Sequence, residues 1–402
     1  MSLEKLDDVI HNIDGIDERF AMLLKKYVYT YINFSTNKEL VSNNLINQIN
    51  SNIKHISVEQ LDGISGHADA KSKTIKINSD LDDYLIDNTF MHEITHLISL
   101  NEIIEDNITY QLNYGLKVGL DDQMDFSAGF RLRNWEVDGN NYVYNKGNVV
   151  LDEWITEWLA NKTSGLTNTE LKEDTNGFFR KKISHGYDGS NVMNLIELVY
   201  GSENIANLIT GLDLNLEERK SVIPIKEIHK INELIDSNSI LLQDEVDIIR
   251  NLQPPYMKTP NVTGLIMYYI SEYQKQRELE NQNVYLQKIM NVLTRTYYVR
   301  FNKEIKGCSS PEDLNKVYNE LSTIQNSMIW NEDINALESL ESYRLFNQMR
   351  KEFTKKTSEL NINNPEFNNL YLTPIQMKEK FKMEEEYIKK HLNKSEDTIR
   401  RI

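Results

Sequence analysis

The seven prolines of this 402-residue chain all lie at or beyond position 224, so they divide the sequence into two unlike parts. The segment QPPYMKTPNVTG (253–264) cannot continue a helix, because proline lacks a backbone N–H and its ring clashes with the preceding turn. We therefore expect a domain boundary or a long turn here, and we place the change of domain between about residues 215 and 262.

Before the prolines, four segments have apolar residues at the spacing of an amphipathic helix. They are residues 17–32, 37–53, 79–100 and 149–165. The third begins with Ser79 and Asp80, residue types that favour a helix N-terminus, and the fourth is closed by Gly165, a residue type that favours a helix C-terminus.

Strand patterns lie between these helices. HISVEQL (55–61) and KTIKIN (73–78) alternate apolar and polar residues, as half-buried strands do, and DGISGHADAKS between them is rich in turn formers. We expect a hairpin or a short connected pair of strands there. FRLRNWEVDGNNYVYNKG (130–147) predicts a second strand pair, joined by an Asp-Gly-Asn-Asn turn.

After the prolines the pattern is helical almost throughout. Residues 264–305 predict one long helix or two. Further helices are expected at 311–328, 334–356 and 373–392. The expected fold class is therefore α+β and predominantly helical, with a small mixed sheet. We divide the chain into an N-terminal helical segment (1–55), a mixed domain (56–215) and an all-α C-terminal domain (216–402).

The charge balance limits the partners of the chain. It carries 45 basic and 61 acidic side chains, for a formal charge of −16, and this excess repels phosphate backbones and anionic lipid. We therefore expect neither a nucleic-acid partner nor docking on a membrane surface. The sequence does not indicate an oligomeric state.

Cys308 is the only cysteine, so no disulfide can form within the chain. The N-terminal segment lacks the apolar core and basic flank of a signal peptide, and no apolar run reaches the ~20 residues of a transmembrane helix. A cytoplasmic location is the resulting expectation, and export without a leader stays open.

The segment TFMHEITHLISLNE (89–102) carries the strongest chemical signal. His92 and His96 are four residues apart, so on a helix both imidazoles can bind one ion at the roughly 2.0–2.1 Å that zinc requires. Glu93 lies beside them, where its carboxylate can take a proton from a water that the ion has acidified. Two ligands and one base on one helix predict a zinc site that performs chemistry.

The alternative interpretation is a pair of exposed histidines on an ordinary amphipathic helix. Apolar residues such as Phe90, Met91 and Ile94 surround the motif, and an uncompensated imidazole is costly in such surroundings. A bound ion would compensate both imidazoles, so we favour the metal site.

A catalytic zinc site needs a third protein ligand, with the fourth position left to water. The metzincin pattern requires a glycine and a third histidine where this chain has Ser99 and Glu102, so that class is excluded. VLDEWITEWLAN (150–161) instead resembles the second zinc-binding helix of the gluzincin metallopeptidases, the thermolysin-like and aminopeptidase-like branch of the zincins. The resemblance covers about residues 65–200 and is specific at the two helices.

The resemblance implies a zincin-like fold for the mixed domain and a third ligand from an acidic pair on the second helix. By that match Glu153 is the ligand, and Glu157, one turn further on, is the acid that braces a metal histidine. Glu157 also stays open as the ligand itself. Other acids that stay open as ligands are Glu102, Asp121, Asp122, Asp125 and Glu136. The interval from His96 to Glu153 is longer than gluzincins usually have, which implies an insertion between the helices.

The resemblance also implies a donor for the oxyanion of the tetrahedral intermediate, which gluzincins take from a downstream His or Tyr. His185 and Tyr187, in the Gly-flanked turn KKISHGYDGSN (181–191), are the first candidates. Tyr142 and Tyr144 come next.

Two further expectations concern the residues before the motif. By the zincin resemblance, TIKIN (74–78) is the sheet edge along which an extended peptide lies. His67, in the preceding turn, is interpreted as a bystander rather than as a metal ligand.

The leading interpretation is a zinc-dependent metallopeptidase of the gluzincin type, with Zn²⁺ as cofactor and a peptide or protein as substrate. The chain lacks the Gly-x-Met-Glu-Asn signature of the zinc aminopeptidases, so we favour an endopeptidase. Glu93 would deprotonate the attacking water and then protonate the leaving amine. The alternatives are an interaction module with structural zinc, acting through its helical C-terminal half, and a hydrolase of a non-peptide amide. An intact Glu93 favours an enzyme, because a structural site needs no base.

Overall fold

The computed structural model describes the backbone of residues 4–104, 125–128, 131–138, 141–147, 149–165, 169–183, 189, 192–214, 240–251 and 261–392. Within these ranges, side chains are described except at Glu4, at 101–149 and at Leu392. None of the helices in this part of the chain is both long enough and apolar enough to cross a lipid bilayer.

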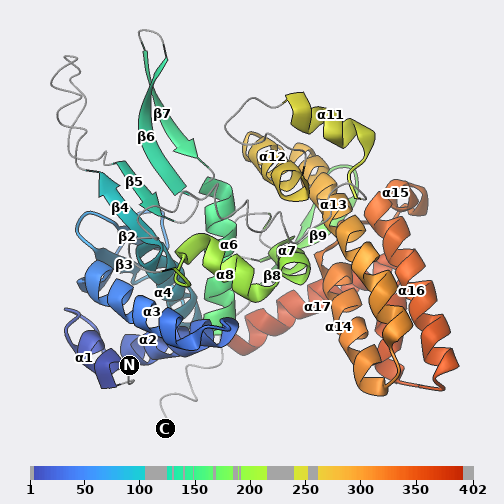
Figure 1. Cartoon of the computed structure of the whole chain (residues 1–402), viewed down its shortest axis with the longest axis horizontal. Helices are drawn as coiled ribbons and strands as arrows, with labels where there is room; N and C mark the ends of the chain where they lie inside the picture. The colour runs from blue at the N-terminus through green and yellow to red at the C-terminus, as the bar shows by residue number, and fades with distance from the viewer. Residues whose placement is uncertain are drawn as a thin grey trace. The chain divides into compact units, whose positions relative to one another are not determined.

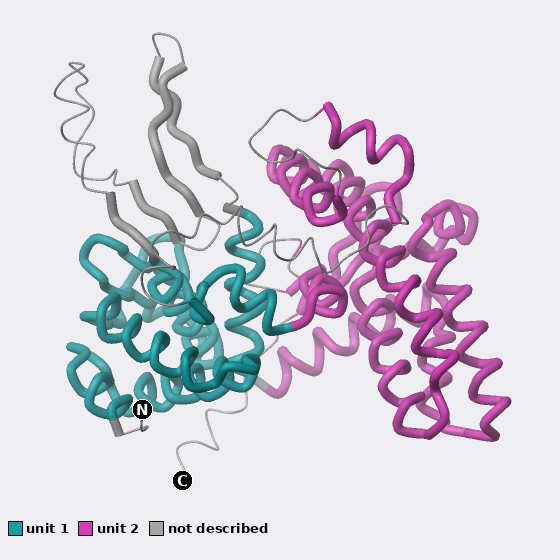
Figure 2. The backbone as a smooth tube through the Cα atoms, in the orientation of Figure 1, with its two compact units in different colours: residues 1–166, 202–227 teal, residues 167–201, 228–402 magenta. Residues whose placement is uncertain are grey.

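The chain divides into two compact units, each built from two stretches of sequence (Figure 2). Unit 1 comprises Met1–Leu166 and Ser202–Glu227, and unit 2 comprises Thr167–Gly201 and Ile228–Ile402. The domain boundaries that we placed at 55/56 and 215/216 stay predictions, since the second falls at the edge of residues outside the described part.

Unit 1 combines helices with two sheets (Figure 1). Its helices are α1 (Glu4–His11), α2 (Glu18–Phe34), α3 (Lys38–Asn52), α4 (Asp83–Ile98), α6 (Val149–Ser164) and α8 (Ser202–Thr210). Its strands are β1 (His55–Glu59), β2 (Gly66–Asp69), β3 (Thr74–Asn78), β4 (Leu100–Ile104), β5 (Asp125–Ala128), β6 (Arg131–Asp138) and β7 (Asn141–Gly147). Helices α2, α3 and α4 lie side by side. The four helices predicted from apolar spacing before the prolines are confirmed as α2, α3, α4 and α6.

Local signals explain where these helices begin and end. The side chain of Asp17 caps α2, because it accepts a hydrogen bond from the backbone amide of Phe20 at 2.8 Å. Gly165 follows α6 with a φ of 73°, in the left-handed region that glycine adopts without strain. The ammonium of Lys26 donates to the carbonyl of Ser164 at 2.5 Å and so satisfies one of the last carbonyl groups of α6.

The first sheet of unit 1 has the order β1-β3-β2, with β1 parallel and β2 antiparallel to β3. This is the small mixed sheet expected from the sequence, but the predicted hairpin is displaced. DGISGHADAKS, which we interpreted as a turn, contains strand β2, and the hairpin joins β2 to β3. Asp69 forms its turn by accepting from the amides of Lys71 and Ser72, and Lys73 takes a φ of 59°.

The segment TIKIN is therefore the central strand of this sheet, and the prediction that it forms an edge is wrong. Both sides of β3 are occupied, by β1 and by β2, so its backbone cannot pair with an added peptide. Among the described strands, β2 is the edge that contacts α4.

The second sheet of unit 1 lies between α4 and α6 in the sequence and has the order β4-β5-β6-β7, antiparallel throughout. Strands β6 and β7 pair from Leu132↔Gly147 to Asp138↔Asn141, which confirms the hairpin predicted over 130–147. This sheet occupies the interval in which the gluzincin resemblance implied an insertion.

Buried contacts fix helix α4 in the core of unit 1. The rings of Phe20 on α2 and Phe90 on α4 lie 4.4 Å apart between centroids, and both are buried. The hydroxyl groups of Tyr27 and Thr95 form a buried hydrogen bond of 3.1 Å. Because α2 holds these two side chains of α4, the rotation of α4 about its axis is set. That rotation turns His92 toward α6.

Unit 2 is mainly helical. Its helices are α7 (Met193–Tyr200), α11 (Gln243–Asn251), α12 (Val262–Gln274), α13 (Leu279–Gly307), α14 (Pro311–Ser327), α15 (Ile334–Ser339), α16 (Glu341–Glu359), the 3-10 helix η3 (Pro365–Tyr371) and α17 (Pro374–Leu392). Its strands are β8 (Thr169–Glu173), β9 (Phe178–Ile183) and β10 (Trp330–Asn331). Helices α13, α14 and α16 run side by side (Figure 1). Of the two alternatives for 264–305, the structure shows two helices, α12 and α13.

The C-terminal region after residue 216, predicted to be all-α, contains one strand in its described part. Strand β10 pairs with β9 through Trp330↔Phe179 and completes a sheet of order β10-β9-β8. Two residues are too few to show the alternation that marks a strand in a sequence. The predominantly helical α+β class is confirmed, and the all-α description of this region is wrong.

Candidate metal centre

Helices α4 and α6 face each other through a line of polar side chains. The line consists of Asn88, His92 and His96 on α4 and of Glu153, Glu157 and Asn161 on α6. On each helix these residues are four apart, which places them on one face. Asn88 contacts Glu157 whereas His96 contacts Glu153, so the two helices run antiparallel.

Three donor atoms converge at one point of this line. His92 Nε2 lies 3.1 Å from Glu153 Oε2 and 3.1 Å from His96 Nε2. His96 Nε2 lies 3.3 Å from the same Glu153 oxygen. In the part of the chain that the structure describes, these three residues form the group of ligating side chains whose donor atoms meet closely enough for one metal ion.

The triangle of donor atoms fits a tetrahedral ion. In a tetrahedron with zinc–ligand bonds of 2.0–2.1 Å, neighbouring ligand atoms are about 3.3 Å apart. The three separations of 3.1–3.3 Å are close to that edge length. Two imidazole nitrogens and one carboxylate oxygen are also a donor set found in catalytic zinc sites, so the residues present fit Zn²⁺.

A proton shared among the same three donor atoms would satisfy them less well than a metal ion would. Each of them offers a lone pair when it carries no hydrogen, and neighbouring lone pairs at about 3 Å repel. One proton lies between two of the atoms and leaves the third facing a lone pair. A metal ion accepts all three lone pairs at once.

Each histidine has a carboxylate on its other ring nitrogen. His92 Nδ1 lies 3.1 Å from Glu157 Oε2, and His96 Nδ1 lies 3.6 Å from Asp152 Oδ2. Glu157 and Asp152 are almost fully buried. Metal-binding histidines usually donate their second N–H to such an acceptor, which orients the ring. Glu157 thus lies where the resemblance implied a bracing acid.

Glu93 is buried beside an edge strand. A Cβ atom added to Gly66 of β2 would lie 3.0 Å from Glu93 Cγ, 3.0 Å from its Oε1 and 2.5 Å from Thr89 Cγ2. Only glycine allows β2 to approach α4 this closely. The carboxylate of Glu93 is therefore next to His92 along the helix and next to β2 across the sheet edge.

The remaining candidates from the sequence cannot be placed at this site. His185 and Tyr187 lie outside the described residues. His67 is exposed on β2 and does not belong to the donor group. The other candidate ligands and oxyanion donors also have side chains outside the described part: Glu102, Asp121, Asp122, Asp125, Glu136, Tyr142 and Tyr144.

Sequence reasoning missed four residues that contact the candidate ligands or their neighbours. Asn88 precedes His92 by four positions, so its place on the same helix face could have been found from spacing. Asp152 precedes Glu153 and could have been considered with it. Gly66 gave no signal, because its contact with Glu93 joins residues that are distant in sequence. The fourth is Asn161, four positions after Glu157.

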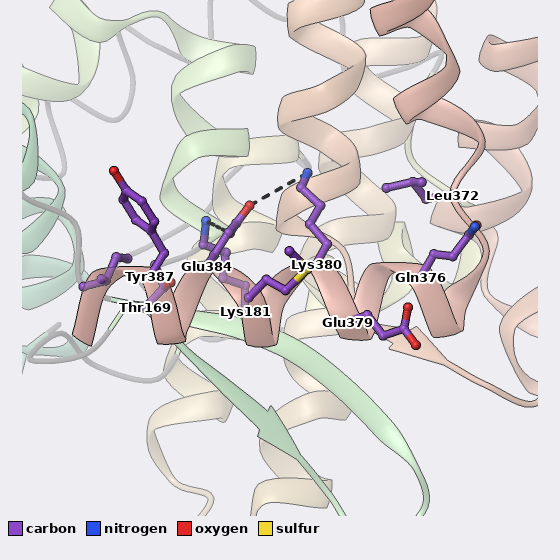
Figure 3. A pocket seen from close by; sticks show the side chains of 10 residues that line it. Thr169, Lys181, Leu372, Gln376, Glu379, Lys380, Glu384 and Tyr387 are labelled. Carbon is purple, nitrogen blue, oxygen red and sulfur yellow. Dashed lines mark ion pairs between the residues drawn. The ribbon is translucent and has the colours of Figure 1, made fainter. Parts of the chain in front are cut away.

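Unit 2 has a pocket of ≈ 540 Å³ along α17, next to β8 and β9 (Figure 3). Its charged lining includes Lys181, Lys380 and Glu384. Lys181 Nζ lies 2.9 Å from Glu384 Oε2, and Lys380 Nζ donates to Asn326 Oδ1 at 2.9 Å. These charged groups already have protein partners, so we locate the candidate functional site at the α4–α6 interface.

Comparisons of the chain with protein-family models, with curated proteins and with solved structures found no match. What the site does is therefore inferred from its geometry and from the motif in the sequence. The donor triangle and the neighbouring Glu93 carry that inference.

Proposed function

We propose that this chain is a zinc-dependent metallopeptidase of the gluzincin type, with His92, His96 and Glu153 as the zinc ligands. The single observation that supports it best is the triangle of donor atoms at 3.1–3.3 Å; Glu93, which directly follows His92 in the sequence, is buried on the same helix. A zincin-like fold for unit 1 is part of this proposal, supported by the two packed helices that carry the ligands. A cytoplasmic location remains our prediction from the sequence.

Glu93 is the proposed general base. When bound, zinc would acidify a water and polarise the carbonyl of the substrate. Glu93 follows His92 directly, so its carboxylate is placed to accept the proton of that water and to return it to the leaving amine. Burial limits the access of bulk water to the carboxylate, which keeps the proton at the site.

The histidines must offer lone pairs from their Nε2 atoms for this function. His92 Nδ1 lies 3.1 Å from Glu157 Oε2, so the carboxylate is placed to accept an Nδ1–H when Nε2 of this ring binds the ion. The bracing residue is Glu rather than the Asp of thermolysin-like enzymes, and its longer side chain reaches across the helix interface.

We propose that a substrate peptide pairs with β2 rather than with β3. The amide of Asn78 donates to the carbonyl of Ser65, so the residues of β2 bond to β3 at alternate positions from there. The backbone groups of Gly66 and Ala68 then point to the free edge, and an extended peptide can add to them. Gly66 also lies against Glu93, so a peptide paired with this residue would lie near the base.

The preference for an endopeptidase and the role of His185 and Tyr187 as oxyanion donors remain parts of the proposal. They rest on the absence of an amine-recognition signature in the sequence and on the gluzincin resemblance, respectively.

The proposal is tested by incubating the zinc-loaded protein with a mixed peptide library and identifying products by mass spectrometry. We expect internal cleavage by the wild type and a loss of rate of about 10²–10⁴-fold in Glu93→Gln, which keeps the shape of the side chain but removes the base. The zinc content of the variant should match the wild type. Equal cleavage by both proteins, or no cleavage by a wild type that retains its zinc, would contradict the proposal.

A second candidate function is an interaction module in which any zinc is structural. It is favoured by a row of exposed apolar side chains on α17, Ile375, Met383 and Tyr387, spaced by multiples of four. The library experiment separates the two candidates, because a structural site binds zinc without cleaving peptides.

A further inference from the structure

The hydrogen bonds at the α4–α6 interface continue beyond the candidate zinc ligands as a directional chain. The hydroxyl of Ser164 donates to Asn88 Oδ1 at 3.2 Å. Asn88 Nδ2 donates to Glu157 Oε1 at 3.1 Å. Glu157 Oε2 lies 3.1 Å from His92 Nδ1. The first three residues are each at most 7 % exposed, so water competes little for these bonds.

The chemistry of the groups sets the direction of every bond. Glu157 Oε1 accepts from Asn88 Nδ2, the only donor group of the asparagine amide. Asn88 must therefore turn its amide nitrogen toward Glu157 and its oxygen toward Ser164. As a zinc ligand through Nε2, His92 carries its proton on Nδ1, the atom that faces Glu157. The lone pair of His92 then lies on Nε2, the atom that faces Glu153 and His96.

We propose that Asn88 is a positioning residue for the metal site: it holds Glu157 in the place and orientation that keep His92 ready to bind the ion. This inference rests on the proposed zinc site and adds a residue that the His-Glu-x-x-His motif does not contain. Asn88 lies on α4, the helix of both histidines, whereas Glu157 lies on α6. The bond between them thus ties the bracing acid to the helix whose histidine it braces.

Asn161 provides the matched comparison. Its Nδ2 donates to the same oxygen, Glu157 Oε1, at 3.2 Å. Asn161 lies one turn from Glu157 on the same helix and is only half-buried, so water can replace its bond and the link between helices stays intact. The structure therefore predicts unequal effects for two asparagines that make the same bond.

The position of Glu157 depends on the hydrogen-bonding groups of the side chain at position 88 as well as on its size. Asn88→Ala removes the donor to Glu157. Asn88→Asp keeps the shape but places a second carboxylate against Glu157, which reverses the direction of the chain or makes the two acids share a proton. Both changes alter how Glu157 presents its oxygens to His92.

The test measures metal affinity separately from folding. Zinc affinity is obtained by competition with a chromophoric chelator, and the visible absorption of the cobalt-substituted protein reports the geometry around the ion. We expect Asn88→Ala and Asn88→Asp to lower zinc affinity by about 10–100-fold, the usual effect of losing a partner of a metal ligand, and to change the cobalt spectrum. Asn161→Ala should lower the affinity by no more than a few-fold and leave the spectrum unchanged.

Other outcomes discriminate between the two proposals. If the Asn88 variants unfold more easily without metal but bind zinc with wild-type affinity and an unchanged cobalt spectrum, Asn88 is structural and the inference is overturned. If the wild type itself binds no zinc, the proposed function fails and this inference with it. Should the Asn88 variants not fold, Ser164→Ala removes the hydroxyl that donates to Asn88, and a smaller loss of affinity in the same direction is required.

Discussion

In unit 2 the guanidinium of Arg295 donates to one buried and one half-buried carboxylate, whereas in unit 1 the carboxylates of Glu153 and Glu157 face imidazole nitrogens. Arg295 forms two bonds with Glu245, two with Glu341 and one with the carbonyl of Ile240. These bonds use all five N–H donors of the side chain. Burial alone lowers the pKa of Arg295, but the bonds with Glu245 and Glu341 outweigh burial and raise it.

The two polar clusters differ in whether they can bind a cation from solution. Arginine keeps its proton at any physiological pH, so Arg295 stays paired with its two carboxylates, and the cluster stabilises only the fold. Imidazole gives up its proton near neutral pH and then offers a lone pair instead. A cluster of imidazoles and carboxylates can therefore bind a cation from solution, which a guanidinium cluster cannot do. The predictions below compare the two clusters.

The largest effect on stability is expected from Arg295→Met. The change leaves Glu245 buried without its cation, which costs about 3–5 kcal/mol of the free energy of unfolding, and it also removes the partner of the half-buried Glu341. Chemical denaturation measures this loss. Zinc affinity of the folded variant should equal that of the wild type, because Arg295 belongs to unit 2 and the candidate ligands to unit 1. An unchanged stability would show that the Arg295 cluster is not an integral part of the fold.

The next largest effect separates the two acids of α6. Glu153→Ala removes one of three proposed ligands, and we expect zinc affinity to fall by at least about 100-fold, or about 2.7 kcal/mol. Glu157→Ala removes the partner of His92 and should cost less, about 10–100-fold. Competition with a chelator measures both affinities. The reverse order would move the ligand one turn along α6.

The close approach of β2 to α4 is tested by Gly66→Ala. The added Cβ would meet Thr89 and Glu93 at 3.0 Å or less, so the strand or the base must shift, at a cost of about 1–3 kcal/mol. We expect peptide hydrolysis to fall more than zinc affinity, because Glu93 moves and the ligands do not. Gly307→Ala in unit 2 is the control, since nothing lies within 4 Å of the added atom. A Gly66 variant with full activity would contradict the placement of β2 beside the base.

The smallest effect is expected at the turn between β2 and β3. Burial raises the pKa of Asp69, but hydrogen bonds from the Ser72 hydroxyl and from the amides of Lys71 and Ser72 outweigh burial and hold the pKa below its ordinary 3.8. A carboxyl with a lowered pKa contributes stability above its unfolded pKa and loses that contribution as the pH falls through its folded pKa.

Asp69→Asn should accordingly reduce the free energy of unfolding near neutral pH by less than about 1 kcal/mol. The difference from the wild type should shrink as the pH falls through the lowered pKa of Asp69, because the wild-type carboxyl is then protonated too. Urea denaturation at several pH values measures it. A difference that grows toward low pH would contradict the sign derived from the turn.

The sequence predicted those parts of the fold that depend on neighbours along the chain. Helices α2, α3, α4 and α6 have long apolar repeats, and the sequence between β6 and β7 contains Asp-Gly, which is typical of a turn. The strand predictions that were wrong or absent have a common physical cause. Strands β2 and β10 are too short for a repeat, and the central position of β3 depends on pairing with β1 and β2, which no local pattern encodes.

The residues of the candidate site likewise divide into those that local spacing predicts and those that depend on how the helices pack. His92, Glu93 and His96 were predicted from spacing alone, because residues four apart share one helix face and Glu93 directly follows His92. Glu153 required a resemblance, since its place beside the histidines depends on how α4 and α6 pack. Asn88 was within reach of the same spacing argument, but the role of an amide becomes visible only when its partner on the other helix is known.

The central claim is that His92, His96 and Glu153 bind one zinc ion. The most direct test is anomalous diffraction from a crystal of the zinc-loaded protein, with data collected on both sides of the zinc absorption edge. We predict one strong anomalous peak within bonding distance of both Nε2 atoms and of a Glu153 oxygen. No peak at that position, or a Glu153 carboxyl turned away from both imidazoles, would contradict the account.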